Sequence, residues 1–371
     1  MHLQKVNTHQ QLKQFIQLPY RLYRHDENWI APLRSEQWAQ FDPQKNPMLT
    51  HCETQLFLLK KGKEVIGRCS AFIDHLAVEH WGEPIGLFGS FECIENEQAA
   101  QLLLEAAQDW LKAHGMTAMR GPWSFASQEW GLEIEGGERP PVILAPHNPP
   151  YYADYFTKFG LNKAIDLIAY LADMKDGYRL PERYLKLTDR ISDRFGVTVR
   201  PVDMNHLEKE VMTIVELSNR SISDNWGYYP VTADEARAMA HDLRQIVNPE
   251  ALLIAQDAEG NPIGFGLSLP DVNTLLKGGN GRLFPFGWLK LLLGLKKIRQ
   301  YRMWALGVVP EYQGKAIDTL LYKATHDALK DSQVCMEINY VLENNHRMNN
   351  ALLKMQVKPI RRYRVYEKTI E

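Results

Sequence analysis

Cysteine is scarce in this chain, with four in 371 residues, and this scarcity limits its chemistry. Cys52, Cys69, Cys93 and Cys335 lie far apart and show none of the short paired spacings of a zinc site. They are too few and too scattered for a disulfide framework, and they suit reduced thiols. We therefore expect neither structural disulfides nor a bound metal.

Long apolar runs and an excess of one charge are also missing. The first residues, Met1-His2-Leu3-Gln4-Lys5, lack the apolar core of a signal peptide, and no apolar run reaches membrane-spanning length. The formal net charge is −2, so no basic field indicates nucleic-acid binding. We expect a cytoplasmic protein with no nucleic-acid partner.

The composition is that of a folded globular protein, and the length suffices for about two domains. Apolar residues make up 45% and charged residues 24% of the chain. This composition leaves the oligomeric state open.

The stretch from Val308 to Asp318 carries the strongest local signal. An apolar strand, Met303–Val309, leads into a turn at Pro310, and a helix is predicted over 316–330. The first backbone N–H groups of a helix have no intrahelical partner, and with the helix dipole they favour a bound anion such as phosphate. The alternative is an ordinary strand–turn–helix connection without a ligand.

This stretch resembles the coenzyme A pyrophosphate loop of the GCN5-related N-acetyltransferase (GNAT) superfamily, Gln/Arg-x-x-Gly-x-Gly/Ala. Gln313 fits the first position, Ala316 replaces the first glycine and Asp318 replaces the second small residue. A carboxylate beside a pyrophosphate repels it unless the side chain points away. The resemblance implies that acetyl-CoA or another acyl-CoA is bound as co-substrate, by Val308, Val309, Gln313, Gly314, Lys315, Ala316, Ile317, Asp318 and Asn345.

The end of the chain resembles the end of the GNAT fold. A strand is predicted over 335–342, a helix over 344–355 and a final strand over 360–369. Asn345 takes the position of the asparagine that opens the family's helix. Leu352 stands where the family often has the tyrosine that protonates the leaving thiolate, so the usual general acid is absent from this half.

The same order of elements occurs twice. In the first half, strands are predicted over 55–60, 64–73, 85–93, 116–120 and 162–173, with helices over 97–114 and 150–159. In the second half, strands are predicted over 196–201, 251–257, 262–270 and 303–309, with helices over 207–219 and 233–248. The fold class is therefore mixed α/β, with two tandem GNAT-like domains, each a mostly antiparallel sheet with helices on both faces.

We place the first domain at 1–178, a linker helix at 179–195 and the second domain at 196–371. The first half has the acidic run Ile94-Glu95-Asn96-Glu97 where an anion site belongs, so coenzyme A is expected only in the second half. The first copy is interpreted as a degenerate domain that supports the fold or shapes the substrate site.

The whole chain also resembles an uncharacterised bacterial group of tandem GNAT-like proteins. The motifs that carry this resemblance are Asn28-Trp29-Ile30-Ala31-Pro32-Leu33, Gly89-Ser90-Phe91-Glu92, Asn148-Pro149-Pro150-Tyr151-Tyr152 and Asn225-Trp226-Gly227-Tyr228-Tyr229-Pro230, together with other short runs. This resemblance supports the fold and leaves the substrate open, because a fold does not determine a function.

Acyl transfer to an amine requires a proton acceptor, a polarised thioester and alignment of the two reactants. Glu337, with Asn339 on the same strand face, is the candidate base, or else caps a hydrogen-bond network. Tyr228 or Tyr229 can supply a hydroxyl, or else packs a turn. A backbone N–H near Val308 or Val309 is the expected donor to the thioester oxygen, as the GNAT resemblance implies.

An insertion at 271–302 is unusual for the family. Trp288, Leu291, Leu292, Leu295 and Ile298 are predicted to share one helical face, beside several basic residues. We favour a lid over an acyl chain or a helix that docks the two halves, because most apolar faces are buried within the protein. Peripheral membrane contact through 286–299 is the less favoured alternative.

Two functions compete at this stage. The first is an acyl-CoA-dependent, N-directed acyltransferase acting on a small-molecule or peptide amine, with acetyl-CoA as the expected donor. The second is a non-catalytic GNAT-like protein that binds a ligand or a partner.

Overall fold

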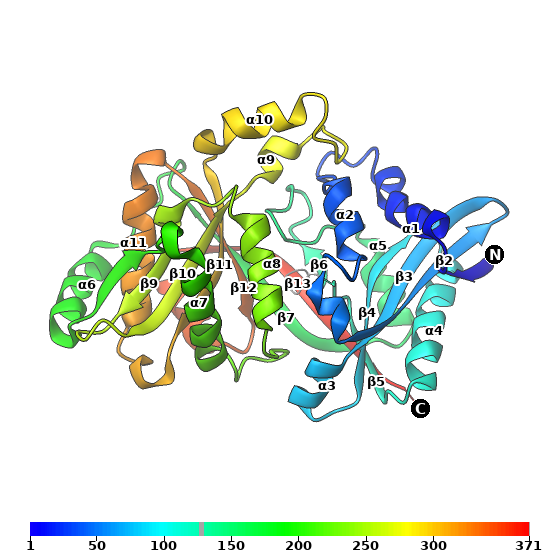
Figure 1. Ribbon diagram of the computed structural model, residues 1–371, viewed down its shortest axis with the longest axis horizontal. Coiled ribbons are helices and arrows are strands. Elements are labelled where there is room, and N and C mark those ends of the chain that lie inside the picture. Colours follow the sequence, from blue (N-terminus) through cyan, green and yellow to red (C-terminus); the bar gives the residue numbers. More distant parts are fainter. Residues whose placement is uncertain (126–129, 371) are drawn as a thin grey trace. The chain divides into compact units, whose positions relative to one another are not determined.

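The computed structural model describes residues 1–125 and 130–370 (Figure 1). Its contacts divide the chain into two compact units. The first comprises Met1–Leu167, Leu276–Trp288 and the residues from Arg361 onward, and the second comprises Ile168–Leu275 and Leu289–Ile360. Two strands, β7 (Asn162–Asp173) and β13 (Lys358–Thr369), contribute residues to both units.

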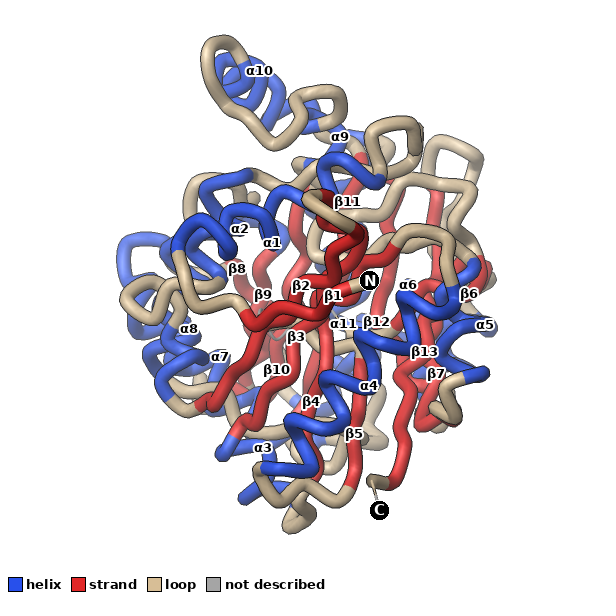
Figure 2. Tube along the Cα trace, turned by 90° about the vertical axis from the view of Figure 1, so that its right-hand side faces the viewer, coloured by secondary structure: helices blue, strands red, loops and turns tan. Residues whose placement is uncertain are grey.

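The sheet of the first unit follows the order β1-β2-β3-β4-β5-β13, with β6 paired to β13 (Figure 2). Its pairs are antiparallel except for β4 and β5, which run parallel. The strands are β1 His2–Lys5, β2 Cys52–Lys61, β3 Glu64–Asp74, β4 Ile85–Cys93, β5 Ala118–Gly121 and β6 Leu132–Glu135. The helices are α1 His9–Leu22, α2 Arg34–Gln40, α3 His75–Trp81, α4 Glu97–Ala113 and α5 Tyr151–Lys158.

Alternation along β2 shows that helices cover both faces of this sheet. Phe57 and Leu59 pack in the cluster that contains residues of α4, whereas Leu58 between them packs against Phe15 and Leu18 of α1. Successive strand residues point to opposite faces, so two apolar faces require apolar residues at consecutive positions. The first unit is therefore a helix–sheet–helix sandwich.

In the second unit the sheet order is β12-β11-β10-β9-β8, with β7 beside β12. Here β11 and β12 run parallel, and the other pairs described are antiparallel. The strands are β8 Thr198–Pro201, β9 Leu252–Gln256, β10 Pro262–Pro270, β11 Gln300–Val308 and β12 Cys335–Leu342. The helices are α6 Glu182–Phe195, α7 Leu207–Ser221, α8 Ala233–Leu243, α9 Asn273–Leu276, α10 Gly287–Gly294, α11 Ile317–Leu329 and α12 His346–Lys354.

The predicted fold class is confirmed, since each unit has a mostly antiparallel sheet flanked by helices. Strands 85–93, 162–173 and 335–342 span the residues predicted for them. Helix α6 lies within the predicted linker segment. Residues of β13 pair with β5 in the first unit, an exchange the sequence did not indicate. The domain boundaries placed at 178 and 195 remain a prediction.

The inserted segment differs from its prediction. Helix α10 ends at Gly294, and a 3₁₀ turn, Leu295–Lys297, follows it. The prediction that Trp288 to Ile298 share one continuous helical face is therefore wrong. Ile298 is buried, whereas Trp288 and Leu292 are exposed. Among the residues that the structure describes, no helix combines the length and apolar character needed to cross a membrane.

Candidate functional site

Strands β11 and β12 are paired over only part of their length. Their parallel register runs from Gln300 opposite Cys335 to Met303 opposite Ile338. On its other side β11 skips a residue, because Leu267 faces Ala305 while Ser268 faces Met303, which leaves a bulge at Trp304. A bulge bends its strand and increases the local twist. The two strands therefore part beyond Met303, as the GNAT resemblance implies.

The structure distinguishes the two expected thioester donors. The Val309 N–H donates to the Ile263 carbonyl at 2.9 Å, so this N–H already has an acceptor on β10. Opposed residues of an antiparallel pair alternate between bonded and non-bonded positions. Val308, which faces Gly264, therefore directs its N–H away from β10, toward the side of β12. Val308 remains the candidate.

The loop between β11 and α11 contains backbone N–H groups without a backbone acceptor. Gly314 has φ +78° and Ala316 has φ +60°. Within the described residues, the N–H groups of Gly314, Ala316 and Ile317 have no backbone acceptor. A Cβ at Gly314 would meet no atom within 4 Å, so the loop is open at this point. Such a turn at a helix start is suited to an anion.

Two side chains of this loop have protein partners. The Gln313 amide donates to the Val308 carbonyl at 3.0 Å and to the Ser221 carbonyl at 3.4 Å, so it braces the loop. The Lys315 ammonium lies 4.5 Å from the ring centroid of Tyr312. These contacts hold the two side chains against the protein.

Asp318 is the residue that opposes an anion here. Burial raises the pKa of Asp318 above its usual range, although Arg347 and the N–H groups of Asp318 and Thr319 favour its charged form. Its carboxyl therefore accepts hydrogen bonds from backbone N–H groups in the first turn of α11. An anionic ligand would bind at this same turn. When charged, the carboxyl would also repel that ligand.

At the start of α12, the structure gives Asn345 a capping role. Its side-chain oxygen accepts a hydrogen bond from the Met348 N–H at 3.0 Å, as an N-cap residue does. Leu352 is fully buried, so an apolar side chain fills the place of the family's tyrosine.

Glu337 and Asn339 do face each other, as expected from their spacing. The Asn339 amide donates to Glu337 Oε1 at 3.0 Å, and both residues are buried. Arg302, also buried, is the cross-strand neighbour of Glu337 at the end of the paired region. The Glu337 carboxylate is therefore a buried polar group next to the point where the strands part.

Tyr228 and Tyr229 lie between α7 and α8. The Tyr228 hydroxyl hydrogen-bonds to the side-chain oxygen of Asn219, and burial raises the pKa of Tyr228 to about 12. Tyr229 is buried. Arg220 of α7 forms an ion pair of 3.2 Å with Glu311, which ties this region to the β11–α11 loop.

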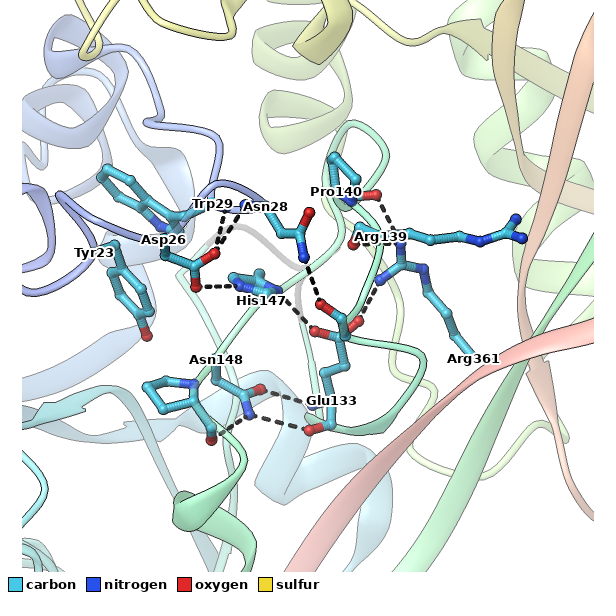
Figure 3. Close-up of polar contacts among 12 residues, drawn as sticks. Tyr23, Asp26, Asn28, Trp29, Glu133, Arg139, Pro140, His147, Asn148 and Arg361 are labelled. Carbon is cyan, nitrogen blue, oxygen red and sulfur yellow. Dashed lines mark hydrogen bonds and ion pairs between the residues drawn. The ribbon is translucent and has the colours of Figure 1, made fainter.

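A second polar cluster, in the first unit, was missed by sequence reasoning (Figure 3). His147 lies between two carboxylates: its Nδ1 is 2.9 Å from Glu133 Oε2, and its Nε2 is 2.8 Å from Asp26 Oδ2. The other oxygen of Glu133 pairs with the Arg361 guanidinium, which also donates to the carbonyls of Arg139 and Pro140 at 2.7 Å each. Negative and positive groups thus alternate from Asp26 to Arg361.

The protonation of His147 follows from its two neighbours. Burial alone lowers the pKa of His147, but the hydrogen bonds to Glu133 and Asp26 outweigh it and raise that pKa above its usual value. In return, the hydrogen bond from His147 lowers the pKa of Asp26 against the opposing effect of burial. A doubly protonated ring, donating at both nitrogens, fits this geometry.

Glu92, at the end of β4, belongs to an adjoining network. The hydroxyl groups of Tyr23 and Tyr152 donate to its Oε2 at 2.7 and 3.0 Å, and Arg68 lies 3.9 Å from its Oε1. Burial raises the pKa of Glu92 despite Arg68 and the two hydroxyls. The Tyr23 ring lies 6.2 Å from that of His147, so the two networks are neighbours.

Three sequence motifs meet in this cluster. Asn28 donates to the Gly137 carbonyl at 3.1 Å, Glu92 binds the two tyrosines, and the Asn148 amide donates to the Glu133 carbonyl at 3.0 Å. The motifs were read from the sequence, but their meeting depends on long-range packing. The first unit therefore contains a buried polar cluster that joins these motifs.

One group of possible metal ligands occurs among the described residues. The ligand atoms of His51, Cys52 and Asp74 lie within 4.8 Å of one another. However, Asp74 Oδ1 already accepts hydrogen bonds from the N–H groups of Leu76 and Ala77, and His51 Nδ1 lies 2.9 Å from that same oxygen. The group is accounted for as a helix cap with a histidine partner.

No protein-family model matches the chain. The chain is 36% identical to the protein YghO of Escherichia coli over 97% of this chain and 93% of that protein. It is also 36% identical to the bacterial ceramide synthase of Caulobacter vibrioides over 98% and 96%, respectively. Among solved structures, a tandem GNAT protein from the clavulanic acid biosynthesis pathway covers 100% of this chain and 99% of its own, with 14% identity and a TM-score of 0.58. The chain therefore belongs to the family that contains YghO and the bacterial ceramide synthase, and its fold is that of the tandem GNAT proteins.

Proposed function

We propose that this protein is an acyl-CoA-dependent N-acyltransferase that joins a long acyl chain to the amino group of a long-chain amine. The observation that carries the proposal is the 36% identity, over nearly the whole chain, to a protein named bacterial ceramide synthase. A ceramide is the N-acyl amide of a long-chain amino alcohol, so its synthesis requires this kind of transfer. The GNAT fold supplies the matching reaction class.

We assign the reaction to the second unit. The N–H groups of Gly314, Ala316 and Ile317, with the positive end of α11, are suited to the pyrophosphate of the donor. Beyond Met303, the parting strands leave Val308 as the donor to the thioester oxygen. This arrangement polarises the carbonyl with backbone groups alone.

The transfer breaks the thioester C–S bond and forms an amide C–N bond. The amine loses a proton, and the departing sulfur takes one up. Glu337 is our candidate acceptor of the amine's proton, because it is buried, hydrogen-bonded by Asn339 and close to the point where β11 and β12 part. Tyr228 and Tyr229 are assigned to the wall of the acceptor site.

The sequence analysis expected acetyl-CoA as the donor, and we propose a longer acyl-CoA in its place. One observation supports the change: the name of the Caulobacter relative, since a ceramide carries a long acyl chain. In this proposal the acceptor is likewise a lipid amine in place of an unspecified small molecule or peptide.

The test is a direct assay on the purified full chain. Acetyl-CoA and palmitoyl-CoA are each offered with a long-chain amino alcohol and, separately, with a short water-soluble amine. Released thiol is measured by a colour reagent, and the amide is identified by mass spectrometry. We expect equal amounts of thiol and amide, with palmitoyl-CoA and the long-chain acceptor preferred. Failure of every donor and acceptor pair to release thiol above the buffer rate would contradict the proposal.

Two observations favour the alternative of a non-catalytic ligand-binding protein. Asp318 occupies first-turn donors of α11, and Leu352 fills the place of the family's general acid. In that case the protein would bind an acyl-CoA or a lipid amine without turnover. Ligand-induced thermal stabilisation with no thiol release would identify this function.

A further inference from the structure

The inserted segment between β10 and β11 has a charge unlike that of the rest of the chain. Residues 272–301 contain no Asp or Glu, whereas the whole chain has a net charge of −2. Six exposed basic residues lie in this segment: Lys277, Arg282, Lys290, Lys296, Lys297 and Arg299. The segment is therefore a local positive surface on a nearly neutral protein.

The same segment also presents large apolar side chains to solvent. Phe284 is 79% exposed and Phe286 75%, and Leu292 and Leu293 are 64% and 63% exposed. Trp288 and Leu289 are exposed as well. Exposed apolar residues grouped in this way usually mark a binding surface, whereas single ones need no explanation.

Helix α10, drawn in yellow in Figure 1, contains both half-buried and exposed residues. On the inner side, a Cβ at Gly294 would lie 2.6 Å from a methyl carbon of Leu275, and Leu291 is half-buried. Leu289, Leu292 and Leu293 are spaced so that they share the opposite face. The expected role of lid or docking helix would bury that face, yet it is exposed.

We propose that this surface, residues 282–299, binds the chain to an anionic lipid bilayer. Phenylalanine, tryptophan and leucine side chains enter the boundary between headgroups and acyl chains, while lysine and arginine bind lipid phosphates. A second copy of the chain is a poorer occupant, because two positive surfaces repel each other. A neutral apolar partner would not complement the positive charge of this segment.

This inference is independent of the proposed function, because membrane binding is measured without catalysis. The full chain is mixed with vesicles of phosphatidylcholine alone, or of phosphatidylcholine with about a third phosphatidylglycerol, and bound protein is separated by flotation. The test variant is Leu292→Gln with Leu293→Gln. The matched control is Leu187→Gln with Leu353→Gln, which changes two exposed leucines of α6 and α12.

We expect binding to the anionic vesicles to exceed binding to the neutral ones at least tenfold and to weaken with added salt. The test variant should bind the anionic vesicles at least tenfold more weakly than the original chain. The control variant should bind them as strongly as the original chain does. Three results would overturn the proposal: no vesicle binding, equal binding by both variants, or self-association that the test variant abolishes without any vesicle binding.

Discussion

Replacing Glu133 with Gln tests whether the cluster around His147 is held together by buried charge. The Glu133 side chain is only 2% exposed, Arg361 is 1% exposed, and His147 lies 2.9 Å away. Glutamine keeps the size of the side chain but leaves two neighbouring cations without the carboxylate between them. Removing one partner of a buried ion pair costs about 3–5 kcal/mol.

Strand β6 offers a matched control. Glu135 pairs with Arg362 at 3.3 Å, but its side chain is 66% exposed. Exposed pairs contribute about 0–1 kcal/mol, so Glu135→Gln should have little effect. For a domain of 150–250 residues, 1 kcal/mol changes Tm by about 2–4 °C, so Glu133→Gln should lower Tm by about 6–20 °C.

Both variants are compared with the original chain by thermal unfolding followed by circular dichroism. Equal, small shifts for Glu133→Gln and Glu135→Gln would refute the reasoning. They would show that the carboxylate of Glu133 contributes no more than a surface group.

Three further predictions concern the two units. Asp318→Asn should lower the dissociation constant for coenzyme A about tenfold, or about 1.4 kcal/mol, because it removes a charge of the same sign as the ligand. Calorimetry measures this constant, and an unchanged value would show that Asp318 does not oppose binding. His147 has a raised pKa in the folded state, so its charged form stabilises the fold fully below about pH 6.5 and loses that effect as pH rises through the folded value. The Tm deficit of His147→Gln should therefore shrink with rising pH, and a deficit that grew would contradict the assignment. Residues 316 and 314 both have positive φ, which glycine adopts more easily than alanine. Ala316→Gly should therefore raise the free energy of unfolding by up to about 1 kcal/mol in denaturant, and Gly314→Ala should lower it by about as much. Shifts of the same sign for the two variants would contradict this reasoning.

Much of the fold was predictable because its signals are local. The strand 85–93 and the helix after it have clear periodicity, and the second-half hairpin is marked by Ala258-Glu259-Gly260-Asn261. Helix α1 was not predicted. Its apolar residues serve two clusters, Phe15 with Leu18 in one and Ile16 with Tyr20 in another, and it contains Pro19, so the helical pattern is weak.

The two candidate sites also differ in whether their residues are close together in the sequence. The β11–α11 loop was found because its donors are consecutive in sequence. The Glu133–Arg361 pair was not found, because its members lie 228 residues apart and meet only through the pairing of β6 with β13. The exposed face of α10 was misjudged because periodicity shows that a helix has an apolar face but not whether another element covers it.

The most direct test of the account compares Gly314→Glu with Gly260→Glu in the acyl-transfer assay. Both glycines have positive φ, +78° and +85°, and open space where a Cβ would be, so the two variants carry similar backbone strain. Only Gly314 lies in the loop assigned to the donor's pyrophosphate. The account predicts that Gly314→Glu abolishes amide formation from palmitoyl-CoA while Gly260→Glu retains it. Amide formation by Gly314→Glu at the rate of the original chain would contradict the assignment of the active site to this loop.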